Sequence, residues 1–214
     1  MPITLRIRLG RAETFVAQGP YRVEMPPERV DGTRLLRLAQ TGELSTFDIA
    51  AIRALLDLAF GDDAEEGFTE DDWQHALGGL HVVAEIEGRI VGHASVVPRT
   101  LWIGDRPIRT GYVEAVATEP SSQGQGIGTA LMRAAGAHIA DGYELGALGT
   151  GAHQFYERLG WRAWQGPSFV RAPNQQRRTP DEDGYILVLE TPSTPQPLDV
   201  NSPIACDWRD GDVW

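Results

Sequence analysis

The pattern of hydrophobic and polar positions divides the chain into segments with strand-like or helix-like periods. Residues 35–38 form an apolar run that is typical of a buried strand. Between Ser45 and Phe60 the apolar residues recur at helical spacing, and Ser45 with Asp48 has the arrangement of a capping box. The first part of the chain therefore predicts a strand followed by a helix that ends at Phe60.

Strand-like segments dominate the middle of the chain. The runs 81–86 and 90–97 predict a hairpin that turns at Glu87 and Gly88. Residues 108–118 predict the next strand, and a helical pattern follows a glycine-rich turn and continues to about residue 140. This order predicts an α+β fold with an antiparallel first half and one crossover at the helix after the turn.

Shorter elements are expected after that helix. They are a strand at 145–148, a helix over 151–159 that ends at Gly160, a hairpin that opens at Trp161, and a strand at 185–189 that closes the sheet.

The two ends carry weaker patterns. Residues 1–32 contain a strand-like alternation from Thr4 to Leu9 and then prolines, so they are expected to form an N-terminal extension with no assigned role. Residues 191–214 hold several prolines and predict an irregular tail. The main domain is expected to span 33–190.

Composition narrows the class of protein and the partners it binds. A hydrophobic content of 42% and a charged content of 23% are ordinary for a globular protein. No run is long and apolar enough to suggest membrane insertion, and the first residues lack a secretory signal, so a cytoplasmic location is expected. The net charge of −11 argues against nucleic-acid binding and favours a cationic co-substrate. The single cysteine excludes an internal disulfide, and the five histidines lack metal-binding spacing, so no metal is expected.

The glycine-rich turn at 123–128 is the most informative segment for chemistry. It lies between the strand at 112–117 and the start of a helix. Glycines let the backbone approach a phosphate closely, and the first N–H groups of a helix have no intrahelical partner and carry partial positive charge. This arrangement predicts a site for a ligand that contains a pyrophosphate.

Three glycine-rich signatures compete for this turn. A Walker loop requires a lysine before its Ser or Thr, but Gly128 precedes Thr129. A dinucleotide fingerprint has uneven glycine spacing, whereas Gly124, Gly126 and Gly128 are evenly spaced and lie past the middle of the chain. The remaining match, Gln/Arg-x-x-Gly-x-Gly/Ala, resembles the acetyl-coenzyme A signature of the GNAT N-acetyltransferase superfamily. The structural alternative is a turn that only caps a helix.

Longer motifs carry a more specific resemblance. They are the segments 68–73, 76–81, 111–117, 145–148, 178–183 and 206–214. Together they are similar to the aminoglycoside 2'-N-acetyltransferases, and the resemblance covers about residues 33–214. It implies a GNAT fold, with a mixed central sheet flanked by about four helices and the glycine turn opening the cofactor helix. It also implies a tail that returns to the substrate pocket and a homodimer.

The resemblance further implies an activity, a co-substrate and site residues. The reaction would be acetyl transfer from acetyl-CoA to the 2'-amine of aminoglycoside antibiotics (gentamicin, tobramycin and the kanamycin class), which confers antibiotic resistance. Glu114 would act as a general base through water, and Tyr156 as a general acid. The backbone of Val116, Ala117 and Thr118 would pair with the pantetheine arm, and the pyrophosphate would be held by Gln123, Gly124, Gln125, Gly126, Ile127 and Gly128. Ala115 and Gly149 would offer backbone to the sugar, and the carboxylate of Trp214 would bind it.

The chemistry suits these residue types. An alkylammonium group with a pKa of about 10.4 must lose a proton before it attacks a thioester, and a partly desolvated carboxylate such as Glu114 is a suitable base. A backbone N–H at Val116, where the strand would splay, would stabilise the oxyanion. A phenol suits the protonation of a leaving thiolate. The structural alternatives are an ion pair between Glu114 and an arginine such as Arg109, and a core role for Tyr156.

A polycationic aminosugar requires several carboxylates at fixed positions. The candidates are Asp72, Asp181, Glu182, Asp212 and the Trp214 carboxylate, together with Asp62, Asp63, Glu65 and Glu66 in the loop before Phe68. The structural alternative is a solvated acidic surface. Two rival functions stay open: acetylation of another cationic amine such as a polyamine, and a noncatalytic acyl-CoA-binding sensor.

Overall fold

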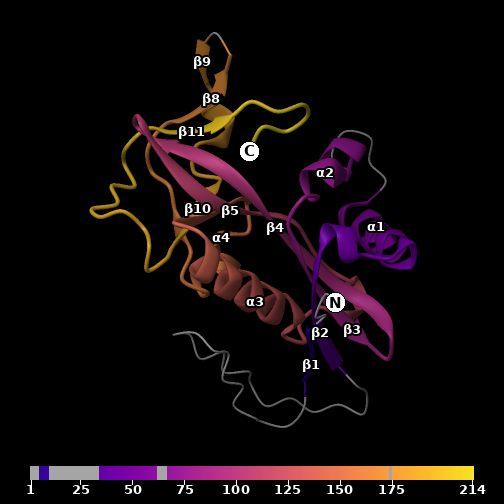
Figure 1. Cartoon of the computed structure of the whole chain (residues 1–214). Helices are drawn as coiled ribbons and strands as arrows, with labels where there is room; N and C mark the ends of the chain where they lie inside the picture. Colours follow the sequence, from indigo (N-terminus) through magenta and orange to yellow (C-terminus); the bar gives the residue numbers. More distant parts are fainter. Residues whose placement is uncertain (1–4, 10–33, 62–66, 174) are drawn as a thin grey trace. The chain divides into compact units, whose positions relative to one another are not determined.

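The computed structural model describes residues 5–9, 34–61, 67–173 and 175–214 (Figure 1). The chain divides into two compact units. The first consists of Met1–Val96 with Glu114–Ala137, and the second of Val97–Val113 with His138–Trp214. Three elements contribute residues to both units, namely strands β4 (Arg89–Ile103) and β5 (Arg106–Thr118) and helix α3 (Ile127–Gly142). Each unit is described by itself.

The strands of the first unit are antiparallel. β1 (Leu5–Leu9) pairs with β2 (Arg34–Gln40), β2 pairs with β3 (Leu80–Ile86), and β3 pairs with β4. The hairpin between β3 and β4 turns at Glu87 and Gly88, which have φ values of 52° and 77°. Two successive residues with positive φ match the right-handed twist of the flanking strands. The predicted hairpin and its turn are therefore confirmed.

Two helices of the first unit begin at capping boxes. α1 (Thr46–Phe60) begins after Ser45, whose side chain and that of Asp48 bond reciprocally to each other's backbone N–H, as predicted. α2 (Glu70–His75) begins after Thr69, which makes the same exchange with Asp72. The apolar face of α1 packs in a core that also contains Trp73 of α2. Each fully buried leucine or isoleucine in such a core stabilises the fold by about 1.5–3 kcal/mol.

The start of α3 packs closely against β4 within the first unit. A Cβ atom added at Gly92 of β4 would lie 2.8 Å from Cγ2 of Ile127 and 3.0 Å from Cδ1 of Leu131. Glycine at this position therefore allows the first turn of the helix to approach the strand. The position of the glycine turn that precedes α3 depends on this contact.

The second unit holds a mixed set of strands. They are β6 (Leu145–Gly149), β7 (Arg162–Ala163), β8 (Ser168–Ala172), β9 (Gln175–Arg178), β10 (Ile186–Glu190) and β11 (Ile204–Asp207). β6 runs parallel to β5 and follows it through α3, which confirms the predicted crossover. β10 pairs antiparallel with both β6 and β7.

Four predictions for the second unit are wrong in part. The tail is not wholly irregular, because β11 pairs antiparallel with β4 and parallel with β8, and its apolar residues are buried. α4 (His153–Glu157) is shorter than the predicted helix, since the residue before it is Ala152, which offers no capping side chain. β10 lies between two strands and does not close the sheet. The hairpin predicted to open at Trp161 is wrong, because β7 pairs with β10 and the hairpin is formed by β8 and β9.

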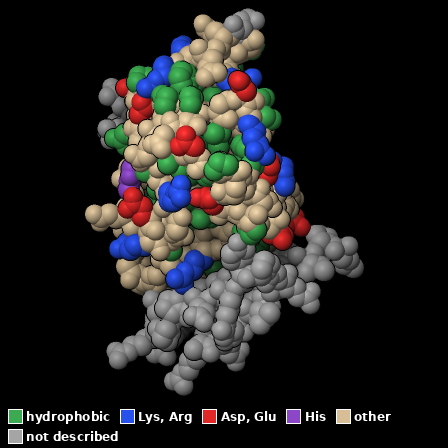
Figure 2. Space-filling view, turned by 90° about the vertical axis from the view of Figure 1, so that its left-hand side faces the viewer, with side chains coloured by type: hydrophobic (Ala, Val, Ile, Leu, Met, Phe, Trp, Pro, Cys, Tyr) green, Lys and Arg blue, Asp and Glu red, His purple; other side chains and the backbone are tan. Residues whose placement is uncertain are grey.

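The described residues contain four α-helices, and within these ranges no helix has the length and apolarity to span a membrane. On the face shown in Figure 2, acidic side chains are scattered among arginines and hydrophobic side chains. Attraction of a cation there depends on local groups of carboxylates more than on one broad acidic patch.

Candidate active site

A kink near the end of β5 is the first distinctive feature of the first unit. Ala115 has a φ of 51°, in the left-handed region, which costs a residue other than glycine about 1–3 kcal/mol. Two buried side chains of β4 bind the backbone here. Ser95 Oγ donates to the carbonyl oxygen of Glu114 at 3.2 Å, and Nδ1 of His93 lies 2.8 Å from the carbonyl oxygen of Ala115. Successive carbonyls of a regular strand point to opposite neighbours, whereas both of these point to β4. The kink therefore resembles a bulge, a feature that re-aims side chains next to active sites.

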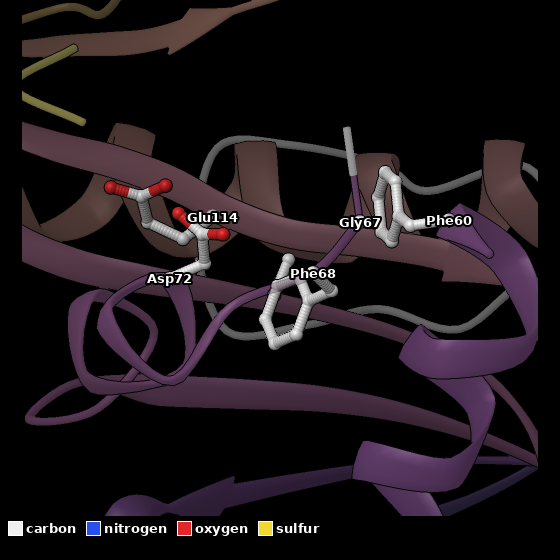
Figure 3. A pocket seen from close by; sticks show the side chains of 6 residues that line it. Phe60, Gly67, Phe68, Asp72 and Glu114 are labelled. Carbon is white, nitrogen blue, oxygen red and sulfur yellow. The ribbon is translucent and has the colours of Figure 1, made fainter. Parts of the chain in front are cut away.

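A cavity of about 200 Å³ lies beside this kink. Its lining comes from the end of α1, the segment before α2, α2 itself and β5, and consists of Phe60, Gly67, Phe68, Asp72, Glu114 and Ala115. In Figure 3 the carboxylates of Asp72 and Glu114 lie on one side of the cavity, and the rings of Phe60 and Phe68 lie on the other. The two rings are stacked with centroids 5.8 Å apart. Carboxylates and aromatic rings lining one cavity suit an amine carried on an apolar or sugar framework.

Asp72 has a structural role as well as a place in the cavity. Its Oδ2 accepts hydrogen bonds of 2.8 Å from both the backbone N–H and the hydroxyl of Thr69, which begins α2. The cap fixes the carboxylate, so its charge is held at the cavity wall without a further loss of side-chain freedom. The local sequence thus positions one predicted substrate ligand through a helix cap.

The glycine turn has the predicted strand–turn–helix geometry in the first unit. Gly124 and Gly126 have φ values of 73° and 80°, which favour glycine, and α3 begins at Ile127. The carbonyl oxygen of Gly126 accepts the first helical hydrogen bond, from Ala130 N at 3.0 Å. Gly124 and Gly126 are exposed, and the first N–H groups of a helix have no intrahelical partner, as an anion site requires. The side-chain amides of the two flanking glutamines donate back into the loop, Gln123 to Thr118 O and Gln125 to Ser121 O, each at 3.4 Å.

A second group of predicted residues gathers around Trp214 in the second unit. The buried indole of Trp214 donates from Nε1 to Thr179 Oγ1 at 3.1 Å, and its backbone N–H donates to Asp212 Oδ1 at 3.0 Å. Arg209 Nη2 donates to the carbonyl oxygen of Trp214 at 3.1 Å. The carbonyl carbon of Trp214 lies 4.0 Å from the point where a Cβ at Gly149 would stand. Gly149, Asp212 and Trp214 therefore meet within this unit.

Glu182 of the second unit lies close to two other predicted acidic residues. Burial, together with the nearby carboxylates of Asp212 and Asp181, raises the pKa of Glu182. A carboxylate whose pKa is raised by nearby like charges gains more electrostatic stabilisation from a bound cation than an isolated carboxylate does. Asp181, Glu182 and Asp212 thus form the predicted acidic group. Asp62, Asp63, Glu65 and Glu66 lie outside the described residues.

Tyr156 is a buried residue of α4 in the second unit. Its ring lies edge-on to Phe155 and Trp161, with centroids 4.8 Å and 6.2 Å away, and burial raises its pKa to about 12. The packing expected of a core tyrosine is therefore present. A phenol is protonated at neutral pH with or without this shift, and the higher pKa makes Tyr156 a weaker proton donor to a thiolate than an ordinary tyrosine. Arg109, the alternative partner considered for Glu114, donates to Gly142 O and lies over the ring of Tyr143.

Some contributors to the site were missed from the sequence. Phe60, Gly67 and Phe68 were not predicted to line a cavity, and His93 and Ser95 were not connected with β5. The histidine was detectable in principle, because it interrupts an apolar strand that the hairpin register pairs with another strand containing His81. Its contact with β5 requires tertiary structure.

Comparisons with known proteins agree with this architecture. The acetyltransferase (GNAT) domain family model matches residues 41–164. The GNAT family N-acetyltransferase YhbS of Escherichia coli, solved in complex with CoA, has a TM-score of 0.60 and 18% identity, with 86% of this chain and 93% of that chain covered. A GNAT family acetyltransferase of Brucella melitensis, in complex with acetyl-CoA, has a TM-score of 0.51 and 24% identity over 75% of this chain and 92% of that chain. The fold is that of a GNAT acetyltransferase, and the predicted fold class is confirmed.

A relative refines this class. An aminoglycoside 2'-N-acetyltransferase of Mycolicibacterium fortuitum is 39% identical over 199 residues, which cover 91% of this chain and 100% of that protein. The chain belongs to the aminoglycoside 2'-N-acetyltransferase family of the GNAT superfamily.

Proposed function

We propose that this enzyme transfers the acetyl group of acetyl-CoA to the 2'-amine of aminoglycoside antibiotics. The observation that carries the proposal is the pair of carboxylates, Asp72 and Glu114, in a cavity beside the kink of β5. Family membership supports the acetyl donor and the acceptor. A cytoplasmic location and a homodimer stay predictions from the sequence.

Glu114 is the proposed general base. Through a water molecule it takes a proton from the 2'-ammonium group, and the free amine attacks the thioester carbonyl. The C–N bond forms, the C–S bond breaks, and Tyr156 supplies a proton to the leaving thiolate of coenzyme A. The nitrogen loses its second proton as the amide forms, and this proton restores the one that Tyr156 donated. The backbone N–H of Val116 stabilises the oxyanion. The left-handed conformation of the preceding residue, Ala115, supports this role because it interrupts the regular strand.

In this proposal, acetyl-CoA and the aminoglycoside contact different sets of residues. The backbone of 116–118 pairs with the pantetheine arm, and the N–H groups of 123–128 bind the pyrophosphate. Asp72 and the backbone of Ala115 bind the sugar at the cavity. Asp181, Glu182, Asp212, the Trp214 carboxylate and the Gly149 backbone bind further amino and hydroxyl groups of the aminoglycoside.

The test compares acceptors that differ at one position. Release of coenzyme A thiol is measured with gentamicin, with an analogue that has a hydroxyl in place of the 2'-amine, and with spermidine. We expect turnover with gentamicin only. Equal rates with the 2'-hydroxyl analogue would contradict the regiochemistry, and a preference for spermidine would favour a polyamine acetyltransferase. Binding of acetyl-CoA without turnover of any amine would favour a sensor.

A further inference from the structure

Two buried histidines connect the kink of β5 to the loop between α2 and β3. His81 of β3 and His93 of β4 are fully buried, and Nδ1 of His81 lies 2.9 Å from Nε2 of His93. At one end Nδ1 of His93 lies 2.8 Å from the carbonyl oxygen of Ala115. At the other end Nε2 of His81 lies 2.9 Å from Oγ1 of Thr41, which accepts a 2.8 Å hydrogen bond from the N–H of Gly78. All five residues belong to the first unit.

The hydrogen bonds of this array run in one direction. The carbonyl oxygen of Ala115 only accepts, so Nδ1 of His93 must carry the hydrogen. A neutral ring then has an acceptor at Nε2, so His81 must donate from its own Nδ1. Nε2 of His81 is left as an acceptor, and the hydroxyl of Thr41 donates to it.

The other acceptor near Thr41 does not compete strongly. The carbonyl oxygen of Gly79 is 3.2 Å from the Thr41 hydroxyl, farther away than Nε2 of His81 at 2.9 Å. It also accepts a 3.0 Å hydrogen bond from the backbone N–H of Thr41, so it keeps a partner when the hydroxyl donates to His81. Burial lowers the pKa of His81 to about 4 and that of His93 to about 3, so both rings are neutral at pH 7. Reversal of either tautomer would place two lone pairs opposite each other, so one arrangement satisfies every polar atom.

We propose that Thr41, His81 and His93 are positioning residues that hold the left-handed peptide at Ala115 and thereby aim the carboxylate of Glu114 into the cavity. His93 donates a directed hydrogen bond to the carbonyl oxygen immediately after the candidate base. Ser95 binds the carbonyl of Glu114 itself, so both carbonyls of the kink are held from β4. These two hydrogen bonds offset the strain of the left-handed conformation at Ala115. The catalytic consequence rests on the proposed function of Glu114, but the hydrogen-bond direction does not.

The direction of the hydrogen bonds through His81 and His93 is tested first, on the protein without ligand. Nitrogen NMR shifts of ¹⁵N-histidine-labelled protein at pH 7 should show two neutral rings that are protonated at Nδ1, the less common form of histidine in water. These two sets of signals should change in the Thr41→Val variant, which removes the donor to His81. Protonation at Nε2 of either buried ring would overturn the proposal, whatever the enzyme acetylates.

The positioning role is tested with variants of His93. His93→Leu removes the donor, whereas His93→Asn places an amide nitrogen near the position of Nδ1 and keeps it. We expect His93→Leu to lower kcat by tenfold or more with a small change in the KM for acetyl-CoA. His93→Asn should recover most of that loss. Adding Ala115→Gly to His93→Leu should also recover part of it, because glycine adopts a positive φ without strain.

Two further readouts separate this role from general stability. His138→Leu, at a histidine of α3 that packs edge-on against Tyr143, is the control and should keep kcat. The backbone amide shifts of Ala115 and Val116 should move in His93→Leu and return in His93→Asn, with or without acetyl transfer. Equal losses of kcat in the Leu and Asn variants, with unmoved amide shifts, would overturn the positioning role.

Discussion

At the scale of single residues, one carboxylate serves both a helix and a cavity. Asp72 caps α2 through Oδ2 and lines the same cavity as Glu114. An acid at the start of a helix is explained by the cap alone, so the sequence left its second role open. The fold supplies the missing information by bringing the kink of β5 to this helix start. Substitution of Asp72 separates the effect of its charge from its role as a helix cap.

Asp72→Asn should raise the KM for the aminoglycoside by about tenfold, which corresponds to about 1.4 kcal/mol. The asparagine oxygen still accepts from Thr69, so the cap is largely kept while the charge is lost. The KM for acetyl-CoA and the melting temperature should change little. The matched control is Asp71→Asn, an exposed acid of the same helix that makes the same change in charge. Equal effects of the two variants on the aminoglycoside KM would contradict a specific contact.

Glu114→Gln should lower kcat by about 10²–10⁴-fold, the usual contribution of a general base. The amide keeps the shape of the side chain but does not take a proton from the ammonium group. Calorimetric affinity for coenzyme A should stay unchanged. A kcat close to that of the unsubstituted enzyme would contradict the role of Glu114 as base.

At the scale of elements, patterns with local causes were the ones predicted from the sequence. The capping box at Ser45, the turn at Glu87–Gly88 and the helix after the glycine turn each depend on neighbouring residues. β11 was missed because its strand character comes from pairing with β4 and β8, which lie far away in the chain. The length of α4 was overestimated. The apolar pattern continues to Leu159, but the helix ends at Glu157, and the N–H groups of Leu159 and Gly160 bond back only three residues, as in single turns.

Gly92→Ala should disturb the glycine turn through the packing of α3. The added Cβ would lie 2.8 Å from Cγ2 of Ile127 and 3.0 Å from Cδ1 of Leu131, so these side chains must move, and we expect the start of the helix to move with them. Overpacking of this kind costs about 1–3 kcal/mol in the free energy of unfolding. The KM for acetyl-CoA should rise as the N–H groups of the turn move. Gly142→Ala, where a Cβ meets no atom within 4 Å, is the control for urea unfolding and for KM.

At the scale of the whole molecule, the sequence predicted the family and the fold class, which are confirmed, and it named candidate site residues that stay predictions. It did not predict the side chains that hold those candidates in place. The site residues were assigned by motif, residue by residue. Phe60 and Phe68 of the cavity, and the histidine array behind Ala115, were missed because they depend on side chains from separate elements that meet only in the folded unit. Sequence motifs identify candidate reacting groups, whereas side-chain packing between separate elements determines how those groups are positioned.

The buried histidines also predict how stability depends on pH. In the unfolded chain their pKa is about 6.5, whereas in the fold it is about 4 for His81 and about 3 for His93. Below pH 6.5 the unfolded state therefore binds more protons than the folded state, so the free energy of unfolding falls as the pH falls. The loss is at most about 1.4 kcal/mol per histidine for each pH unit between about 6 and 4. Urea unfolding at pH 7 and pH 5 measures it, and an unchanged free energy of unfolding would contradict two buried neutral rings.

The central claim is that acetyl-CoA donates one acetyl group to the 2'-nitrogen of an aminoglycoside at the Glu114 cavity. Structural identification of the product formed from tobramycin and acetyl-CoA tests it most directly. By mass spectrometry and NMR we expect a single added acetyl group, carried on the 2'-nitrogen, and no such product with Glu114→Gln under the same conditions. Acetylation of another nitrogen, or the same yield from the Gln variant, would contradict the account.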